Sequence, residues 1–117
     1  MMMHAELEIL LEIQDLRALE RDITAAEYAA AGIPVDVDAV TARLTERITE
    51  RETALSPRTQ SAYRRIAKRH ERVVAPVLQG VCYGCFVHVP TSKGRDRERN
   101  TELRTCESCG RFIYYAD

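Results

Sequence analysis

Gly80-Val81-Cys82-Tyr83-Gly84-Cys85 and Cys106-Glu107-Ser108-Cys109-Gly110-Arg111 are the two stretches that decide the fold of this chain. Each contains a Cys-x-x-Cys pair, and together they hold all four cysteines of the sequence, with 20 residues between the pairs. Such a turn brings two thiolates to one ion, and this spacing is typical of a tetrahedral Zn²⁺ site. Four thiolates fill the coordination sphere, so we predict one structural zinc ion without an open position for catalysis. Its ligands are Cys82, Cys85, Cys106 and Cys109.

Gly84 and Gly110 lie inside or just after the two turns. We expect both to adopt positive φ, which lets backbone N–H groups turn toward sulfur. Two alternatives use the same cysteines. Disulfides would suit an exported protein, but a charged helical pattern follows Met1–Glu6 where a signal peptide would carry an apolar segment. A thioredoxin-like redox motif would need a βαβ context, which the sequence lacks.

The 117 residues carry a net charge of −1, so the overall charge does not indicate a nucleic-acid partner. The charge is nevertheless unevenly distributed: residues 1–40 carry −7, residues 41–72 carry +5 and residues 73–117 carry +1. No apolar run approaches the roughly 20 residues that span a bilayer. We therefore expect a cytoplasmic protein without a membrane segment.

Two amphipathic helices are predicted before the cysteines. Residues 4–31 contain neither Gly nor Pro, and apolar side chains recur every three or four positions until Gly32 and Pro34 end the pattern. Asp36 or Asp38 can act as the N-cap of a second helix with a similar stripe. Two helices joined by a short turn predict an antiparallel helical hairpin, a short coiled coil with an acidic and a basic helix.

Ser56-Pro57 is typical of a helix start, and the sequence leaves open whether it breaks the second helix or only kinks it. Short strands are predicted at residues 73–78, 86–90, 103–105 and 112–115, with a polar loop at 91–100. The predicted fold class is therefore α+β: a helical hairpin arm over residues 1–72, then a C4 zinc ribbon of short antiparallel strands over residues 73–117.

The chain resembles the bacterial C4-type zinc-ribbon proteins that have a coiled-coil N-terminal arm. The resemblance rests on Tyr63–Arg69, Val74–Val77, Gly80–Cys85 and Cys106–Tyr114. Members of that family are regarded as nucleic-acid-binding or protein-binding adaptors, linked to an alternative sigma factor, to flagellar or secretion systems, or to mRNA. The resemblance implies an adaptor with a protein partner in the transcription, motility or secretion machinery. The arm is shorter here than in the family.

Basic residues gather just before the first cysteine pair and predict contacts with nucleic-acid phosphates, to RNA or single-stranded DNA. These candidates are Arg58, Arg64, Arg65, Lys68, Arg69 and Arg72, with Lys93, Arg95, Arg97 and Arg99 in the following loop. Aromatic residues that can stack on bases are Tyr63, Tyr83, Phe86 and Tyr115. The competing interpretation is a solvated basic face paired with the acidic first helix.

Three further hypotheses remain at the level of sequence. A hairpin on a C4 base resembles the secondary-channel regulators of RNA polymerase, which place acids at the tip, where Asp36 and Asp38 are expected here; N-capping explains at least one of them without that role. The stripe of the first helix can also be buried by pairing with a second copy, giving a homodimer. We do not expect an enzyme, because His4, His70 and His88 are scattered and no nucleophile–base pair is recognisable.

Overall fold

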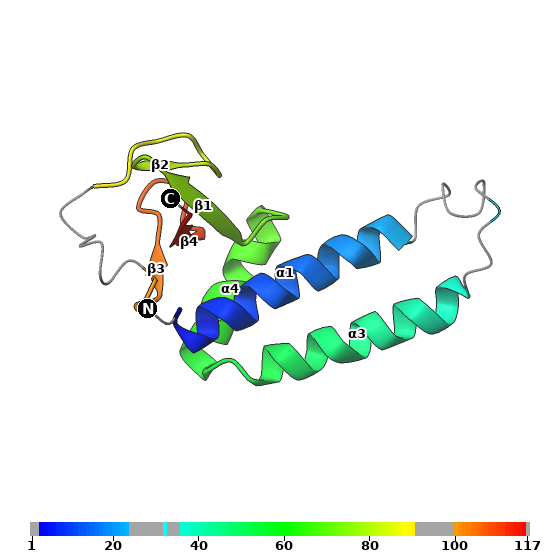
Figure 1. Ribbon diagram of the computed structural model, residues 1–117. Helices are drawn as coiled ribbons and strands as arrows, with labels where there is room; N and C mark the ends of the chain where they lie inside the picture. Colours follow the sequence, from blue (N-terminus) through cyan, green and yellow to red (C-terminus); the bar gives the residue numbers. More distant parts are fainter. Residues whose placement is uncertain (1–2, 24–31, 33–35, 91–99, 117) are drawn as a thin grey trace.

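The computed structural model describes residues 3–23, 32, 36–90 and 100–116. Three helices come first: α1 (Ala5–Ile23), α3 (Val37–Thr53) and α4 (Pro57–Arg69). Four short strands follow, and Figure 1 shows them gathered at one end of the elongated helical part. The predicted α+β class is confirmed. No helix in the described ranges combines the length and apolar character that a membrane span requires.

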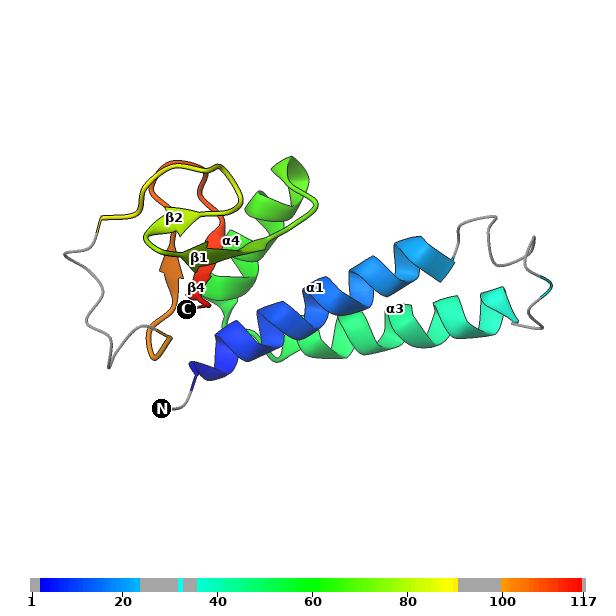
Figure 2. The same ribbon diagram turned by 45° about the horizontal axis from the view of Figure 1, so that its top comes forward.

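Helices α1 and α3 lie side by side and run in opposite directions (Figures 1 and 2). Glu12 of α1 forms ion pairs with Arg47 and Arg51 of α3, at 2.8 and 3.0 Å. Helix α3 has three arginines and four carboxylates, so the helix beside the acidic first helix is not a basic one, and the excess of cations lies in α4. The segments 24–31 and 33–35 lie outside the described residues, so the predicted continuation of the first helix to residue 31 is not tested.

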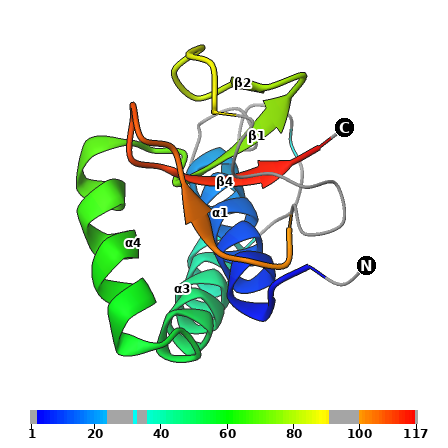
Figure 3. The same cartoon turned by 90° about the vertical axis from the view of Figure 1, so that its left-hand side faces the viewer.

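The two helix starts that the sequence predicted are confirmed. Asp36 is the N-cap of α3, and its Oδ1 accepts a hydrogen bond from the backbone N–H of Ala39 at 3.1 Å. Ser56 caps α4 in the same way, with Pro57 in the first turn. Because α3 ends at Thr53 and α4 begins at Pro57, Ser56-Pro57 separates two helices. Figure 3 shows α4 turned away from the α1–α3 pair and lying beside the sheet.

A carboxylate from α1 fixes the start of α4. Glu6 Oε1 accepts from the backbone N–H of Ser56 at 2.7 Å, and Glu6 Oε2 accepts from the Thr59 hydroxyl at 2.6 Å. Burial raises the pKa of Glu6, but the hydrogen bonds from Thr59 and Ser56 outweigh it, so the pKa lies below its usual value of 4.5. Glu6 of α1 therefore caps the N-terminus of α4 and joins these two helices.

We expect Glu6→Gln to lower the free energy of unfolding by about 1 kcal/mol at neutral pH, because a charged acceptor is lost from two hydrogen bonds. A depressed folded-state pKa stabilises the fold above the unfolded-state pKa, and this stabilisation is lost as pH falls through the folded-state pKa. The difference between wild type and variant should thus shrink in acid. Denaturant unfolding across pH measures it, with the exposed neighbour Glu8→Gln as the control; an equal loss at every pH would contradict the role of the charge.

The sheet has the strand order β2-β1-β4-β3, formed by β1 (Val74–Leu78), β2 (Val81–Cys82), β3 (Arg104–Thr105) and β4 (Phe112–Tyr115). Strands β1 and β4 are parallel, whereas β1–β2 and β3–β4 are antiparallel. The prediction of a wholly antiparallel ribbon is therefore wrong. The strand predicted at 86–90 is also wrong, because this segment contributes only the bridge between Val81 and His88.

A tight turn before the first cysteine explains the parallel pair. Gln79 and Gly80 both have positive φ, +50° and +77°, and they join the paired residues Leu78 and Val81 as a two-residue hairpin loop. Strand β2 therefore leads into the first cysteine pair while β1 runs away from it. Because β4 leaves the second pair, β1 and β4 point in the same direction.

The sheet separates two apolar clusters. Val74 and Phe112 face the helices and pack with buried residues of α1, α3 and α4, including Leu10, Ile48 and Tyr63. The next residues along the same strands, Ala75 and Ile113, belong to a smaller cluster with Val77, Cys82 and Cys106. The larger core draws side chains from both sides of the boundary at residues 72 and 73, and the division into two domains stays a prediction.

Candidate metal centre and adjoining basic surface

The sulfur atoms of the four cysteines all lie within 4.8 Å of one another. Cys82 Sγ is 4.0 Å from Cys109 Sγ, and Cys85 Sγ is 3.7 Å from Cys106 Sγ. These distances exclude disulfide bonds, which need about 2.05 Å. They agree with the edge of about 3.8 Å of a tetrahedron whose metal–sulfur distance is about 2.3 Å. The residues present therefore fit a four-coordinate metal ion.

The two Cys-x-x-Cys turns, which we call the first knuckle (residues 82–86) and the second knuckle (residues 106–110), repeat one local structure. In the first knuckle the backbone N–H groups of Gly84 and Cys85 point to the Cys82 sulfur. In the second, those of Ser108 and Cys109 point to the Cys106 sulfur. Amides directed at sulfur stabilise a thiolate. In each knuckle the first cysteine is buried and the second is half-buried.

The protonation of the free thiols differs from site to site. Burial raises the pKa of the Cys82 thiol to about 12, and burial raises the pKa of Cys106 as well. Burial acts in the same direction on Cys85, but hydrogen bonds from the Val87 N–H and the neighbouring side chains lower its pKa to about 7. A metal ion that binds here must therefore displace protons from the two buried thiols.

Both knuckles close with a residue of positive φ, four positions after the first cysteine. Gly110 has φ +79° and donates its N–H to the Cys106 carbonyl at 2.8 Å. Phe86 has φ +60° and donates to the Cys82 carbonyl at 2.6 Å. The prediction of positive φ is confirmed for Gly110 and wrong for Gly84. Gly84 is needed for space instead, because a Cβ there would lie 2.9 Å from the Arg111 side chain and 3.1 Å from Ala75 Cβ.

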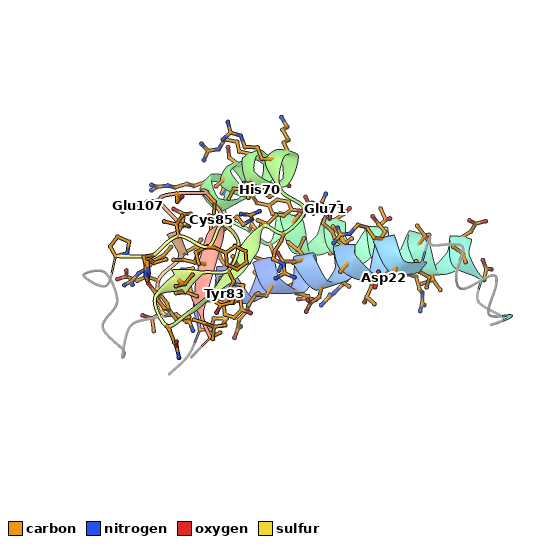
Figure 4. The ribbon with its side chains drawn as sticks, turned by 90° about the horizontal axis from the view of Figure 1, so that it is seen from above. Asp22, His70, Glu71, Tyr83, Cys85 and Glu107 are labelled. Atoms are coloured by element: carbon orange, nitrogen blue, oxygen red, sulfur yellow. The ribbon has the colours of Figure 1, made fainter. Side chains whose placement is uncertain are left out.

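Helix α4 carries five cations and no carboxylate between Pro57 and Arg69. All six predicted phosphate-contacting residues are exposed: Arg58, Arg64, Arg65, Lys68, Arg69 and Arg72. Among the described residues none of them forms an ion pair, whereas Arg47, Arg51 and Arg104 do. The ion pairs of α1 run from Glu12 to α3, and within the described residues no carboxylate of α1 is paired with a cation of α4. Figure 4 shows side chains with nitrogen atoms at their tips reaching outward from α4.

A groove of about 500 Å³ separates α4 from the second knuckle. We call it the α4 groove; Arg65, Lys68 and Arg69 line one side, and Cys109 and Gly110 line the other. His70, at the end of α4, lies 3.3 Å through Nε2 from the Cys109 carbonyl oxygen, which holds the helix against the knuckle. No local pattern predicts this contact, because it joins residues 39 positions apart.

The remaining candidates are in different surroundings. Tyr63 is buried beneath the Arg17 guanidinium, 5.5 Å from its ring centre, so it is not available to a ligand. Tyr115 is half-buried and its backbone is bonded to the Asn100 side chain. Asp38 lies exposed in the first turn of α3. That Asp36 and Asp38 act at a hairpin tip stays a prediction, and the loop cations at 93–99 lie outside the described residues.

No family model and no curated protein matches this chain. The chain is similar in fold to a solved structure, that of CT398 from Chlamydia trachomatis at 2.12 Å resolution, with a TM-score of 0.57 and 23% sequence identity. The match covers 86% of this chain and 43% of CT398, so the chain spans less than half the length of that protein. The likeness concerns the fold of helices followed by a small sheet.

Proposed function

We propose that this protein is a non-catalytic zinc-binding adaptor that binds RNA or single-stranded DNA through the exposed cations of α4. The observation that carries the proposal is the unpaired basic face described above, which lies next to a groove against the second knuckle. Side chains without an intramolecular carboxylate partner keep their full charge for phosphates. The family resemblance of the knuckle sequences agrees with this function.

Zinc is the proposed metal. Four thiolates in a closed set suit Zn²⁺, which accepts tetrahedral sulfur ligation and undergoes no redox chemistry. The ion would join β2 to the β3–β4 hairpin on the side of the sheet away from the helices, where the apolar cluster around Ala75 and Ile113 is small. Its role would be structural, and it would keep the second knuckle in position beside α4.

The helices α1 and α3 are proposed to form an antiparallel hairpin. Their ion pairs through Glu12 and the burial of Leu10 and Ile13 against Ile48 support this arrangement. In this proposal the hairpin carries α4 and the sheet at its base. It would also keep Glu12 of the acidic helix paired with α3.

The test measures binding of a labelled single-stranded RNA and its DNA equivalent over a range of salt concentrations. The wild type should bind, and the logarithm of its affinity should fall linearly with the logarithm of salt. The triple variant Arg65→Ala/Lys68→Ala/Arg69→Ala should reduce that slope by about 2, since each lost single-strand phosphate contact contributes about 0.7.

The control is Arg43→Ala, which removes an exposed cation from α3, away from the α4 groove. Its slope and affinity should stay close to the wild-type values. Absence of wild-type binding at low salt would contradict the proposal. An equal effect of Arg43→Ala and Arg69→Ala would also contradict it, because binding would then follow net charge alone.

A further inference from the structure

The backbone at position 86 has a conformation that favours glycine, but the residue there is phenylalanine. Phe86 and Gly110 occupy the same place in the two knuckles, four residues after the first cysteine, with positive φ and the same hydrogen bond to the cysteine carbonyl. Glycine adopts this backbone conformation without steric cost, whereas a bulky residue there is an outlier. The second knuckle uses the residue that folding favours, and the first does not.

Burial does not explain the phenylalanine either. Phe86 is 71% exposed, more than any other large apolar side chain among the described residues that are exposed. Its neighbours Tyr83 and Val87 are each 46% exposed. The ring therefore adds backbone strain without adding to the core. Strained, exposed residues of this kind are found where a ligand is bound.

The rings of Tyr83 and Phe86 form a pair, with centroids 5.5 Å apart and planes inclined by 56°. We call them the knuckle aromatic pair. A tilted pair presents one ring face outward beside the edge of the other, which suits a flat π-system as the next member of the stack. Figure 4 labels Tyr83 and Cys85 of the first knuckle, with His70, the C-cap of α4, near Cys85.

An arginine side chain lies beside the aromatic pair. The Arg111 side chain lies against Gly84, between the two aromatic positions, and its Nε donates to the Arg72 carbonyl at 2.9 Å. Arg72 is itself exposed. The stretch from Gln79 to Pro90 contains no Asp or Glu. An apolar protein segment needs no such cations, whereas a nucleotide supplies both a flat base and a phosphate.

We propose that the knuckle aromatic pair stacks an unpaired base and makes the protein select single-stranded over double-stranded nucleic acid. This inference rests on the proposed function, since the cations of α4 supply the affinity for the backbone. Stacking needs a base whose faces are free, and a duplex offers such faces only at its ends. The cations bind single-stranded and double-stranded nucleic acid alike, and the aromatic pair distinguishes the two.

The first experiment compares Phe86→Gly with the wild type on one oligonucleotide, single-stranded and annealed to its complement. We expect Phe86→Gly to bind the single strand about tenfold more weakly, to bind the duplex as before, and to keep the salt slope. Because glycine suits the positive φ, the unfolding temperature should be unchanged or higher. Weaker binding by a protein that is at least as stable separates a ligand contact from a folding defect.

Phe86→Leu is the matched control for the chemistry of the ring, because it keeps an apolar side chain at the same strained position. It should lose single-strand binding as Phe86→Gly does if the contact is stacking. The chain has no tryptophan, so Phe86→Trp places one reporter at the site. Its fluorescence should be quenched by the single strand and left unchanged by a blunt duplex bound at equal occupancy.

If Phe86→Gly binds single strands as well as the wild type does, and the α4 triple variant does not bind them, the base-stacking inference is overturned. The proposed function then still stands. Retained binding by Phe86→Leu would overturn stacking in favour of a simple apolar contact. Equal losses on single strand and duplex would overturn the selectivity. Absence of wild-type binding at low salt would overturn both proposals together.

Discussion

Cys106→Ser is expected to release the metal and unfold the C-terminal sheet. Cys106 is buried, and on its side of the sheet the fully buried apolar residues of the described part are Ala75, Val77 and Ile113 besides two cysteines, with Val89 and Tyr115 partly buried against them. A structural zinc site contributes about 10–16 kcal/mol of binding free energy in small zinc modules, which is as large as the whole stability of a typical domain, about 5–15 kcal/mol. The strands are also too short to hold themselves, since β2 and β3 have two residues each.

Metal content measured by mass spectrometry under native conditions should fall from one ion per chain to none in Cys106→Ser. Amide hydrogen exchange should at the same time lose protection in β1 and β4. Chelation of the wild type should reproduce both results. The control is Glu107→Gln, a change of an exposed residue in the middle of the same knuckle. One ion per chain in Cys106→Ser, or an intact sheet without metal, would contradict the proposed architecture.

Phe112→Ala should destabilise the whole protein by about 3–5 kcal/mol, the cost of deleting a buried aromatic side chain. Phe112 is 3% exposed and packs on the helix side of the sheet, in the core that contains Leu10 and Tyr63. Because this core is shared, we expect the helical circular-dichroism signal and metal release to follow the same denaturant transition, at a lower midpoint. Val87→Ala, which shortens an exposed apolar side chain, should change little.

Helices that melt in a separate transition from metal release would contradict this prediction. They would instead favour two independent units divided near residue 72. The measurement therefore also tests the domain boundary that the sequence indicated.

Local signals in the sequence predicted what depends on local physics. The spacing of the cysteines predicted one site, and their sulfur atoms do converge. Ser56-Pro57 and Asp36 predicted helix starts that the structure confirms, because a cap satisfies N–H groups within three residues of itself. Strand β4 has the predicted bounds, since Phe112–Tyr115 is a compact aromatic and β-branched run.

The errors concern contacts between distant segments and one turn. Gln79-Gly80 is a weak hairpin signal compared with Asn-Gly or Asp-Gly, so the reversal before Cys82 was missed, and with it the parallel pairing of β1 and β4. The position of α4 beside the sheet depends on where the chain turns after α3, which no local pattern specifies. The aromatic ring of Phe86 predicts base stacking, but no sequence pattern predicts that its backbone shares the positive φ of Gly110.

The shared core also constrains how the chain acquires its structure during synthesis. Leu7 and Phe112 belong to the same cluster although they are separated by about 100 residues, so the contacts have a high sequence separation and their loop closure is costly. While the polypeptide is being elongated, the apolar side of α1 can be covered in part by α3 but not by the sheet. Completion of this core has to wait until the second knuckle has been translated, and a transient chaperone contact on α1 would be useful until then.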